Sequence, residues 1–141
     1  MLLTPSKVFH RVILDSVLGN FNEETKFKVH GIAHVTGGGI PGNIPRLFHN
    51  DNLGADIQDW HAPHEAIKDL VNLGNVDEKE AYKTWNSGTA MMLVVNEADA
   101  QNIADALNTY DSEIEAKIVG EIDNSGSIKL LSKYSESEIT F

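Results

Sequence analysis

The chain has 141 residues and a mass of 15.5 kDa, the usual size of one domain. Hydrophobic residues make up 41% and charged residues 23%, which argues against a disordered chain. Acidic residues outnumber basic ones 21 to 11, and the formal charge of -10 disfavours nucleic acids and anionic membranes as partners. The absence of cysteine excludes disulfides, thiolate zinc sites and thiol nucleophiles. Because neither a membrane-spanning run nor a signal peptide is recognisable, we expect a cytoplasmic protein.

The first half of the chain shows helix, strand and turn signals in alternation. The predicted elements are a helix over 4–18, a strand over 26–35, a short helix entered through Pro45 and a buried strand over 54–58. Thr4 and Pro5 suit the start of the first helix, and Gly19 suits its end. The strand runs into Thr36-Gly37-Gly38-Gly39, which favours a turn because glycine is costly inside a helix or strand.

The second half predicts more regular elements. These are helices over 63–73, 77–83 and 96–108, and strands over 89–95, 114–122 and 127–131. Asp77 followed by Glu80 resembles a capping box. The unbroken apolar run over 89–95 indicates a strand covered on both faces, whereas the alternation over 114–122 indicates one wet face. Asn124-Ser125-Gly126 predicts the turn of a terminal hairpin.

These elements together predict an α+β (α/β-like) domain with a mixed β-sheet and flanking helices. We expect one partial domain over 1–134 and a frayed acidic tail over 135–141. The chain opens on a helix and has few strands before its glycine-rich loop, which suggests that an opening segment of the core is lacking.

The strongest candidate for a binding site is the glycine-rich loop. Three successive glycines after a strand let backbone N–H groups converge on an anion without interference from Cβ atoms. Thr36 can add a hydroxyl and Arg46 a fixed positive charge. The alternative is a tight strand-to-helix turn without a ligand. The sequence is neither a Walker A motif nor a dinucleotide fingerprint.

The histidines do not predict a metal site. Five of them lie close together in sequence: His30, His34, His49, His61 and His64. No carboxylate stands at a ligand spacing from them, and Pro63 separates the last two. We therefore predict no metal site, and expect His34 to be hydrogen-bonded within the fold or to face a substrate.

A second candidate is the polar segment 82–88, which precedes the most apolar strand. Tyr82, Asn86 and Gly88 are candidates for lining a cleft, because polar residues at a strand mouth often line pockets. The alternative is that Tyr82 packs its helix while Asn86 and Gly88 form a turn, and composition favours this alternative. Asp56 is a weaker candidate for binding a ligand hydroxyl. No pair of a nucleophile and a general base can be recognised in the sequence, so no catalytic residue is assigned.

Three motifs, in order along the chain, resemble one family of enzymes. Gly31-Ile32-Ala33-His34-Val35-Thr36-Gly37-Gly38-Gly39 with Asn43-Ile44-Pro45-Arg46 resembles the glycine-rich signature of aminoimidazole ribonucleotide synthetases, the phosphoribosylformylglycinamidine cyclo-ligases. Tyr82-Lys83-Thr84-Trp85-Asn86-Ser87-Gly88 and the opening Leu2-Leu3-Thr4-Pro5 resemble two further motifs of that family. The resemblance runs from Leu2 to about Ile122, and Gly42 departs from it by replacing a glutamate.

The resemblance covers only the C-terminal domain of that family, and it implies a fold and a reaction. The reaction is ATP-driven imidazole ring closure in purine biosynthesis, with ATP and magnesium as cofactors and formylglycinamidine ribonucleotide as substrate. By position, the residues implied to contact substrate or phosphate are His34, Thr36, Gly37, Gly38, Gly39, Asn43 and Arg46. No cofactor is expected for this chain alone, because the nucleotide is held chiefly by the N-terminal half of these enzymes.

The sequence therefore predicts the C-terminal domain of a cyclo-ligase, inactive as an isolated chain. Its expected partners are the ribonucleotide, an N-terminal ATP-binding half and, through surface left uncovered, a second copy of itself. The alternative is a non-catalytic binding or scaffold module that kept the fold and lost the reaction.

Overall fold

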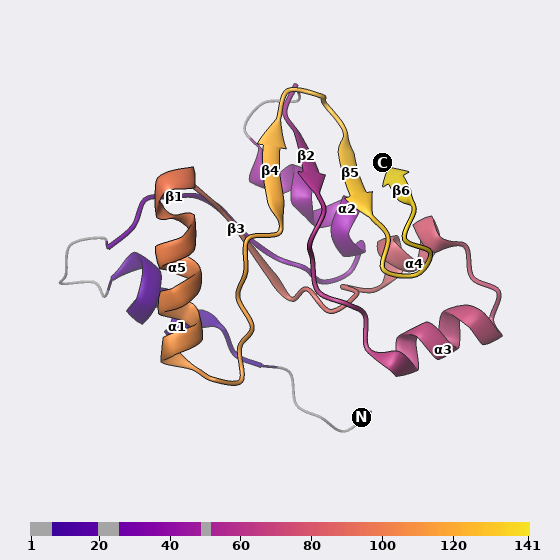
Figure 1. Ribbon diagram of the computed structural model, residues 1–141, viewed down its shortest axis with the longest axis horizontal. Coiled ribbons are helices and arrows are strands. Elements are labelled where there is room, and N and C mark those ends of the chain that lie inside the picture. The colour runs from indigo at the N-terminus through magenta and orange to yellow at the C-terminus, as the bar shows by residue number, and fades with distance from the viewer. Residues whose placement is uncertain (1–6, 20–25, 49–51) are drawn as a thin grey trace. The chain divides into compact units, whose positions relative to one another are not determined.

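The computed structural model describes residues 7–19, 26–48 and 52–141 (Figure 1). The chain divides into two compact units, which are described here one at a time. The helical unit comprises Met1–Val29 and Val95–Lys117, and the sheet unit comprises His30–Val94 and Ile118–Phe141. The predicted helix start at Thr4 and Pro5, together with His49, lies outside the described residues. No helix within the described ranges is long and apolar enough to cross a membrane.

The helical unit packs a short N-terminal helix against a long one. α1 (His10–Ile13) continues into a π-helical turn, η1 (Leu14–Leu18), and both contact α5 (Glu97–Tyr110). Gly19, with a φ of 81°, ends this element as predicted. The buried residues recur at helical spacing on the two faces that meet: Val12, Ile13, Val17, Ile103, Ala104 and Leu107. The predicted helix over 96–108 is thus confirmed.

A four-stranded mixed sheet forms the centre of the sheet unit, as predicted. Its order is β4 (Gly120–Asp123), β2 (Gly54–Ile57), β5 (Ile128–Leu131) and β6 (Glu138–Thr140), which Figure 1 shows side by side. β2 runs antiparallel to β4 and parallel to β5, while β5 and β6 are antiparallel.

The predicted hairpin at 124–126 is wrong, because β2 lies between the two strands that this turn connects. Asp123 accepts hydrogen bonds from the N–H and Oγ of Ser125, which folds the connection over the start of β2. Gly54 permits this crossing: a Cβ there would lie 2.3 Å from both Ser125 Oγ and the Ser127 carbonyl oxygen. Residues that usually form the tight turn between two paired strands therefore form a loop here that crosses over the start of β2.

The frayed tail expected over 135–141 is also wrong, since this segment contains β6. Ile139 is buried at 7% exposure, and Phe141 packs against the same core. Phe141 and Ile128 exchange two backbone hydrogen bonds, of 2.9 and 3.1 Å. Burial of these two apolar side chains outweighs the solvation of the acidic residues Glu136 and Glu138 that precede them.

Two further strands, β1 (Val29–His34) and β3 (Met91–Val95), pair with each other. The Val35 N–H donates to the Ala90 carbonyl at 2.8 Å, so the end of β1 lies beside the start of β3. Every residue of β3 is only half-buried, so the expectation that both faces are fully covered is wrong.

The strand expected over 114–122 is shorter than predicted and begins at Gly120. The reason lies in Asn108, whose side chain donates to the Ala116 carbonyl and accepts from the Ala116 N–H, both at 2.8 Å. These bonds satisfy the backbone of Ala116 from α5 instead of from a neighbouring strand. An alternating pattern therefore does not become a strand along its whole length.

Four helical elements complete the sheet unit: α2 (Gly39–Asn43), the 3-10 turn η2 (Ile44–Leu47), α3 (Glu65–Leu73) and α4 (Glu78–Thr84). The helix predicted to enter at Pro45 begins earlier, at Gly39. The core gathers side chains from both helices and strands: Val35, Ile40, Ile44, Ala55, Ile57, Trp60, Tyr82, Ile128, Leu130 and Ile139.

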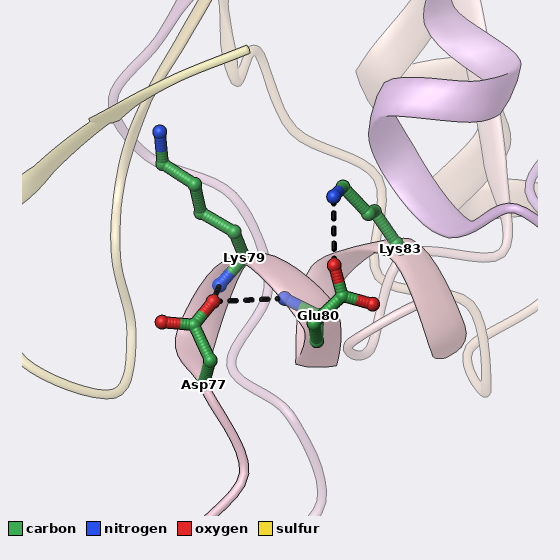
Figure 2. Close-up of polar contacts among 4 residues, drawn as sticks. All are labelled: Asp77, Lys79, Glu80 and Lys83. Atoms are coloured by element: carbon green, nitrogen blue, oxygen red, sulfur yellow. Dashed lines mark hydrogen bonds and ion pairs between the residues drawn. The ribbon is translucent and has the colours of Figure 1, made fainter.

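Asp77 caps α4, as predicted, by accepting the N–H groups of Lys79 at 3.0 Å and Glu80 at 3.3 Å (Figure 2). Glu80 does not return the interaction, and pairs instead with Lys83 at 2.7 Å. Asp77→Ala is expected to lower the free energy of unfolding by about 1 kcal/mol. Glu80→Ala, which removes only an exposed ion pair, should cost less than about 0.5 kcal/mol. Urea unfolding measures both, and equal losses would contradict the assigned cap.

Candidate functional site

The glycine turn, defined as residues 36–39, links β1 to α2. It is closed by a 3.0 Å hydrogen bond from the Gly39 N–H to the Thr36 carbonyl. Gly38 and Gly39 have φ values of 88° and 55°, a region that only glycine enters readily. The expectation that all three glycine N–H groups face a ligand is therefore wrong for Gly39. Within the described chain, the N–H groups of Gly37 and Gly38 have no partner, and both residues are exposed.

Asn43 holds the glycine turn from inside. Its side chain is 1% exposed, and Nδ2 donates to the carbonyls of Gly39 at 2.6 Å and Gly37 at 3.3 Å. The C=O and N–H of a trans peptide point in opposite directions, so fixing the Gly37 carbonyl inward turns the Gly38 N–H away from Asn43. The Asn43 side chain thus orients the turn, a role that its position in the sequence did not reveal.

Arg46 completes this arrangement from the surface. Its Nη1 donates to Asn43 Oδ1 at 3.3 Å, which places a guanidinium two hydrogen bonds from the glycine carbonyls. Arg46, His34 and Thr36 are all exposed, as a ligand-contacting role requires. Their contact with a substrate stays a prediction.

The glycine turn lies against the end of α4, and Gly39 makes this approach possible. A Cβ at Gly39 would stand 1.9 Å from the Tyr82 carbonyl oxygen and 2.9 Å from the Lys83 carbonyl carbon. No larger residue fits without moving one of the two backbones. Gly37 and Gly42, by contrast, have nothing within 4 Å of the corresponding position.

Asn86 and Gly88 belong to a second turn, residues 86–89, closed by a 3.0 Å bond from the Thr89 N–H to the Asn86 carbonyl. Ser87 and Gly88 have φ values of 49° and 89°, and the Gly88 N–H donates to Asn86 Oδ1 at 3.3 Å. Gly88 also packs against the Ala62 carbonyl, 2.3 Å from where its Cβ would lie. The turn alternative for these residues is thus what the structure contains.

Tyr82 is a core residue, so the expectation that it lines a cleft is wrong. Its side chain has 0% exposure, and its ring lies 5.0 Å from that of Trp60 and 5.1 Å from that of Tyr134. Its hydroxyl accepts the Lys133 N–H at 2.8 Å and shares a 3.3 Å hydrogen bond with Ser132 Oγ. Burial raises the pKa of Tyr82.

His64 and His61 make contacts within the fold. His64 Nδ1 accepts the Ala66 N–H at 3.1 Å and caps α3, while His61 Nδ1 lies 3.4 Å from Thr89 Oγ1. Over the described ranges, no group of three or more His, Asp or Glu side chains is arranged to hold a metal ion.

The contacts around Ser132 were not foreseen from the sequence. Ser132 has 0% exposure, and its Oγ donates to Glu78 Oε2 at 2.7 Å while accepting the Tyr134 N–H at 3.1 Å. Glu78 and Ser132 are 54 residues apart, and neither stands in a motif, so no local signal connects them.

Comparison with known proteins assigns the sequence to a family. The family model described as AIR synthase related protein, C-terminal domain, matches residues 14–133. The chain belongs to this family, as the resemblance in its motifs indicated.

Among curated proteins, the chain is similar to three cyclo-ligases. It is 34% identical over 122 residues to the phosphoribosylformylglycinamidine cyclo-ligase of Methanopyrus kandleri, 35% to that of Pseudothermotoga lettingae and 36% to that of Geotalea daltonii. Each match covers 86% of this chain, and 32%, 33% and 32% of the respective relative. The chain thus spans about a third of the length of the relatives that it matches.

Proposed function

We propose that this chain acts as the C-terminal, substrate-binding part of a phosphoribosylformylglycinamidine cyclo-ligase, in ATP-dependent imidazole ring closure in the cytoplasm. The observation that carries the proposal is the glycine turn held by Asn43, with the Gly38 N–H directed away from the buried amide. The family match and the similarity to named cyclo-ligases support it.

The ligand group assigned to this turn is the phosphate of formylglycinamidine ribonucleotide. The N–H groups of Gly37 and Gly38 offer two donors, and Thr36 and Arg46 add a hydroxyl and a positive charge. Since the chain carries a net charge of -10, these local donors must overcome an unfavourable overall field. His34, at the end of β1, is proposed as a further substrate contact, and Asn43 and Gly39 maintain the turn.

ATP and magnesium are the cofactors that the family implies, with ATP supplying the phosphoryl group that activates the formyl oxygen. The described residues provide no acidic cluster for a metal ion, and no described residue is assigned to either group. In this proposal the chain's own residues bind and orient the ribonucleotide, and the nucleotide is held by a separate N-terminal partner.

Calorimetric titration of the purified chain with formylglycinamidine ribonucleotide tests the site. Arg46→Ala is expected to weaken binding about tenfold, the effect of losing one charge-assisted hydrogen bond. Arg11→Ala, which changes the net charge equally but lies in the helical unit, is the matched control and should leave affinity unchanged. Equal losses in both variants, or none in either, would overturn the phosphate site and favour a scaffold module.

We expect the chain alone to form no imidazole product from formylglycinamidine ribonucleotide and ATP. The reason is that the residues proposed here bind the substrate, whereas the nucleotide-binding half is expected on a partner. A discontinuous assay for the aminoimidazole product measures this, with a full-length cyclo-ligase as positive control. Sustained turnover by the chain alone would contradict the division of roles.

We also propose that the chain self-associates through apolar surface. Leu70 and Leu73 of α3 are 53% and 87% exposed, and Ile122 of the edge strand β4 is 40% exposed. Sedimentation velocity over a range of concentrations is expected to show a dimer that Leu73→Glu weakens. A strictly monomeric chain at high concentration would contradict this.

A further inference from the structure

Tyr82 spans the distance between the glycine turn and the loop that connects β5 to β6. At its backbone end, the Tyr82 carbonyl packs so closely on Gly39 that a Cβ there would lie 1.9 Å away. At its other end, the phenol oxygen bonds to the Lys133 N–H and to Ser132 Oγ. One fully buried residue thus contacts both segments directly.

The loop end of this connection is itself fixed. Ser132 Oγ donates to Glu78 Oε2 at 2.7 Å, and Ser135 Oγ donates to the same oxygen at 2.9 Å. The Ser132 N–H donates to the Ser137 carbonyl at 2.8 Å, which closes the loop on itself. Since Glu78 begins α4 and Tyr82 lies one turn later, the loop holds this helix at two points.

The aromatic ring of Tyr82 also has little freedom to move. Trp60 and Tyr134 pack on Tyr82, and the side chain has no exposed surface. A close-packed side chain transmits a displacement instead of absorbing it. A change at the phenol hydroxyl is therefore expected to move the Tyr82 carbonyl, and with it Gly39.

We propose that Tyr82 is a positioning residue for the glycine turn, through which the β5–β6 loop sets the direction of the Gly38 N–H. This inference rests on the proposed function only where ligand affinity is concerned, because the position of the turn can be observed without any ligand. It assigns a role in the site to the segment 132–137 of the β5–β6 loop.

The test is Tyr82→Phe, which removes one oxygen and keeps the ring. In amide NMR spectra of the full chain, the Gly38 and Gly39 resonances are expected to shift more than that of Gly74, which ends α3. Tyr110→Phe is the matched control, since Tyr110 also loses a hydroxyl bond, to Asp15 Oδ2 at 2.6 Å, but belongs to the helical unit. It should leave the Gly38 and Gly39 resonances in place.

A second variant keeps the inference falsifiable if Tyr82→Phe does not fold. Ser132→Ala leaves the phenol and its bond to Lys133 intact and is expected to shift the same two glycine resonances by a smaller amount. Unmoved Gly38 and Gly39 resonances in a folded variant of either kind would overturn the positioning role.

Titration with formylglycinamidine ribonucleotide then separates this inference from the proposed function. Tyr82→Phe should weaken binding about three- to tenfold, the range expected for one net hydrogen bond, while Tyr110→Phe should not. If the resonances shift but the unmodified chain binds no ribonucleotide, the positioning role stands and the proposed function fails. If the unmodified chain binds and Tyr82→Phe binds equally well, the positioning role is overturned.

Discussion

Gly39→Ala is expected to lower the free energy of unfolding by about 2–4 kcal/mol. The new Cβ would lie 1.9 Å from the Tyr82 carbonyl oxygen, and the φ of 55° is unfavourable for any residue with a Cβ. Both costs fall on backbone atoms, which cannot rotate away as a side chain can. Urea unfolding followed by circular dichroism measures the loss.

Gly42→Ala is the matched control, three residues further along the same helix. Nothing lies within 4 Å of its Cβ position, and alanine is favoured over glycine inside a helix by up to about 1 kcal/mol. We therefore expect Gly42→Ala to be neutral or stabilising. A destabilisation of Gly42→Ala as large as that of Gly39→Ala would show that the packing of α2 against α4 is not the cause.

Asn43→Asp is expected to cost about 2–4 kcal/mol at neutral pH, although the two side chains have nearly the same shape. A carboxylate cannot donate, so it would face the carbonyl oxygens of Gly39 and Gly37, now 2.6 and 3.3 Å from Nδ2. Arg46 Nη1 lies 3.3 Å from Asn43 Oδ1, but its positive charge would offset only part of this cost because Arg46 is exposed. The loss is measured as the difference in unfolding free energy from the unmodified chain.

The pH dependence of this difference identifies its cause. The neutral acid can donate one hydrogen bond, so the folded state raises the pKa of the introduced group above its unfolded value of about 3.9. The stabilisation that the neutral form contributes to the folded state is then complete below the unfolded pKa, and it is lost as the pH rises through the folded pKa. We therefore expect the difference to shrink between pH 7 and pH 4. A difference independent of pH would argue against direct repulsion by the carboxylate.

The fold could be predicted where one local signal decided the outcome. Asp77 predicted the cap of α4 because its side chain reaches only its own first turn. Gly19 marked the end of η1 for a similar reason. The crossing of residues 124–127 over Gly54 could not be predicted, because it depends on which strand fills the space between β4 and β5. Turn composition does not contain that information.

The candidate site, too, could be predicted from the sequence only in part. The glycine turn stood out because three glycines in succession have few explanations, and its motif led to the family that the comparison shows. The inward direction of the Gly37 and Gly39 carbonyls was not predictable, since it follows from the burial of Asn43. The sequence could not decide between a cleft and the core for Tyr82, because an aromatic residue beside polar ones is equally typical of a core that satisfies its hydroxyl internally.

The position of β2 in the middle of its sheet affects when the sheet can form during synthesis of the chain. Its two neighbours, β4 and β5, are separated from it in sequence by α3, α4, β3 and α5. During synthesis β2 emerges long before either neighbour exists, with both of its hydrogen-bonding edges unoccupied. The sheet unit therefore forms only after contacts between segments that are distant in sequence become possible.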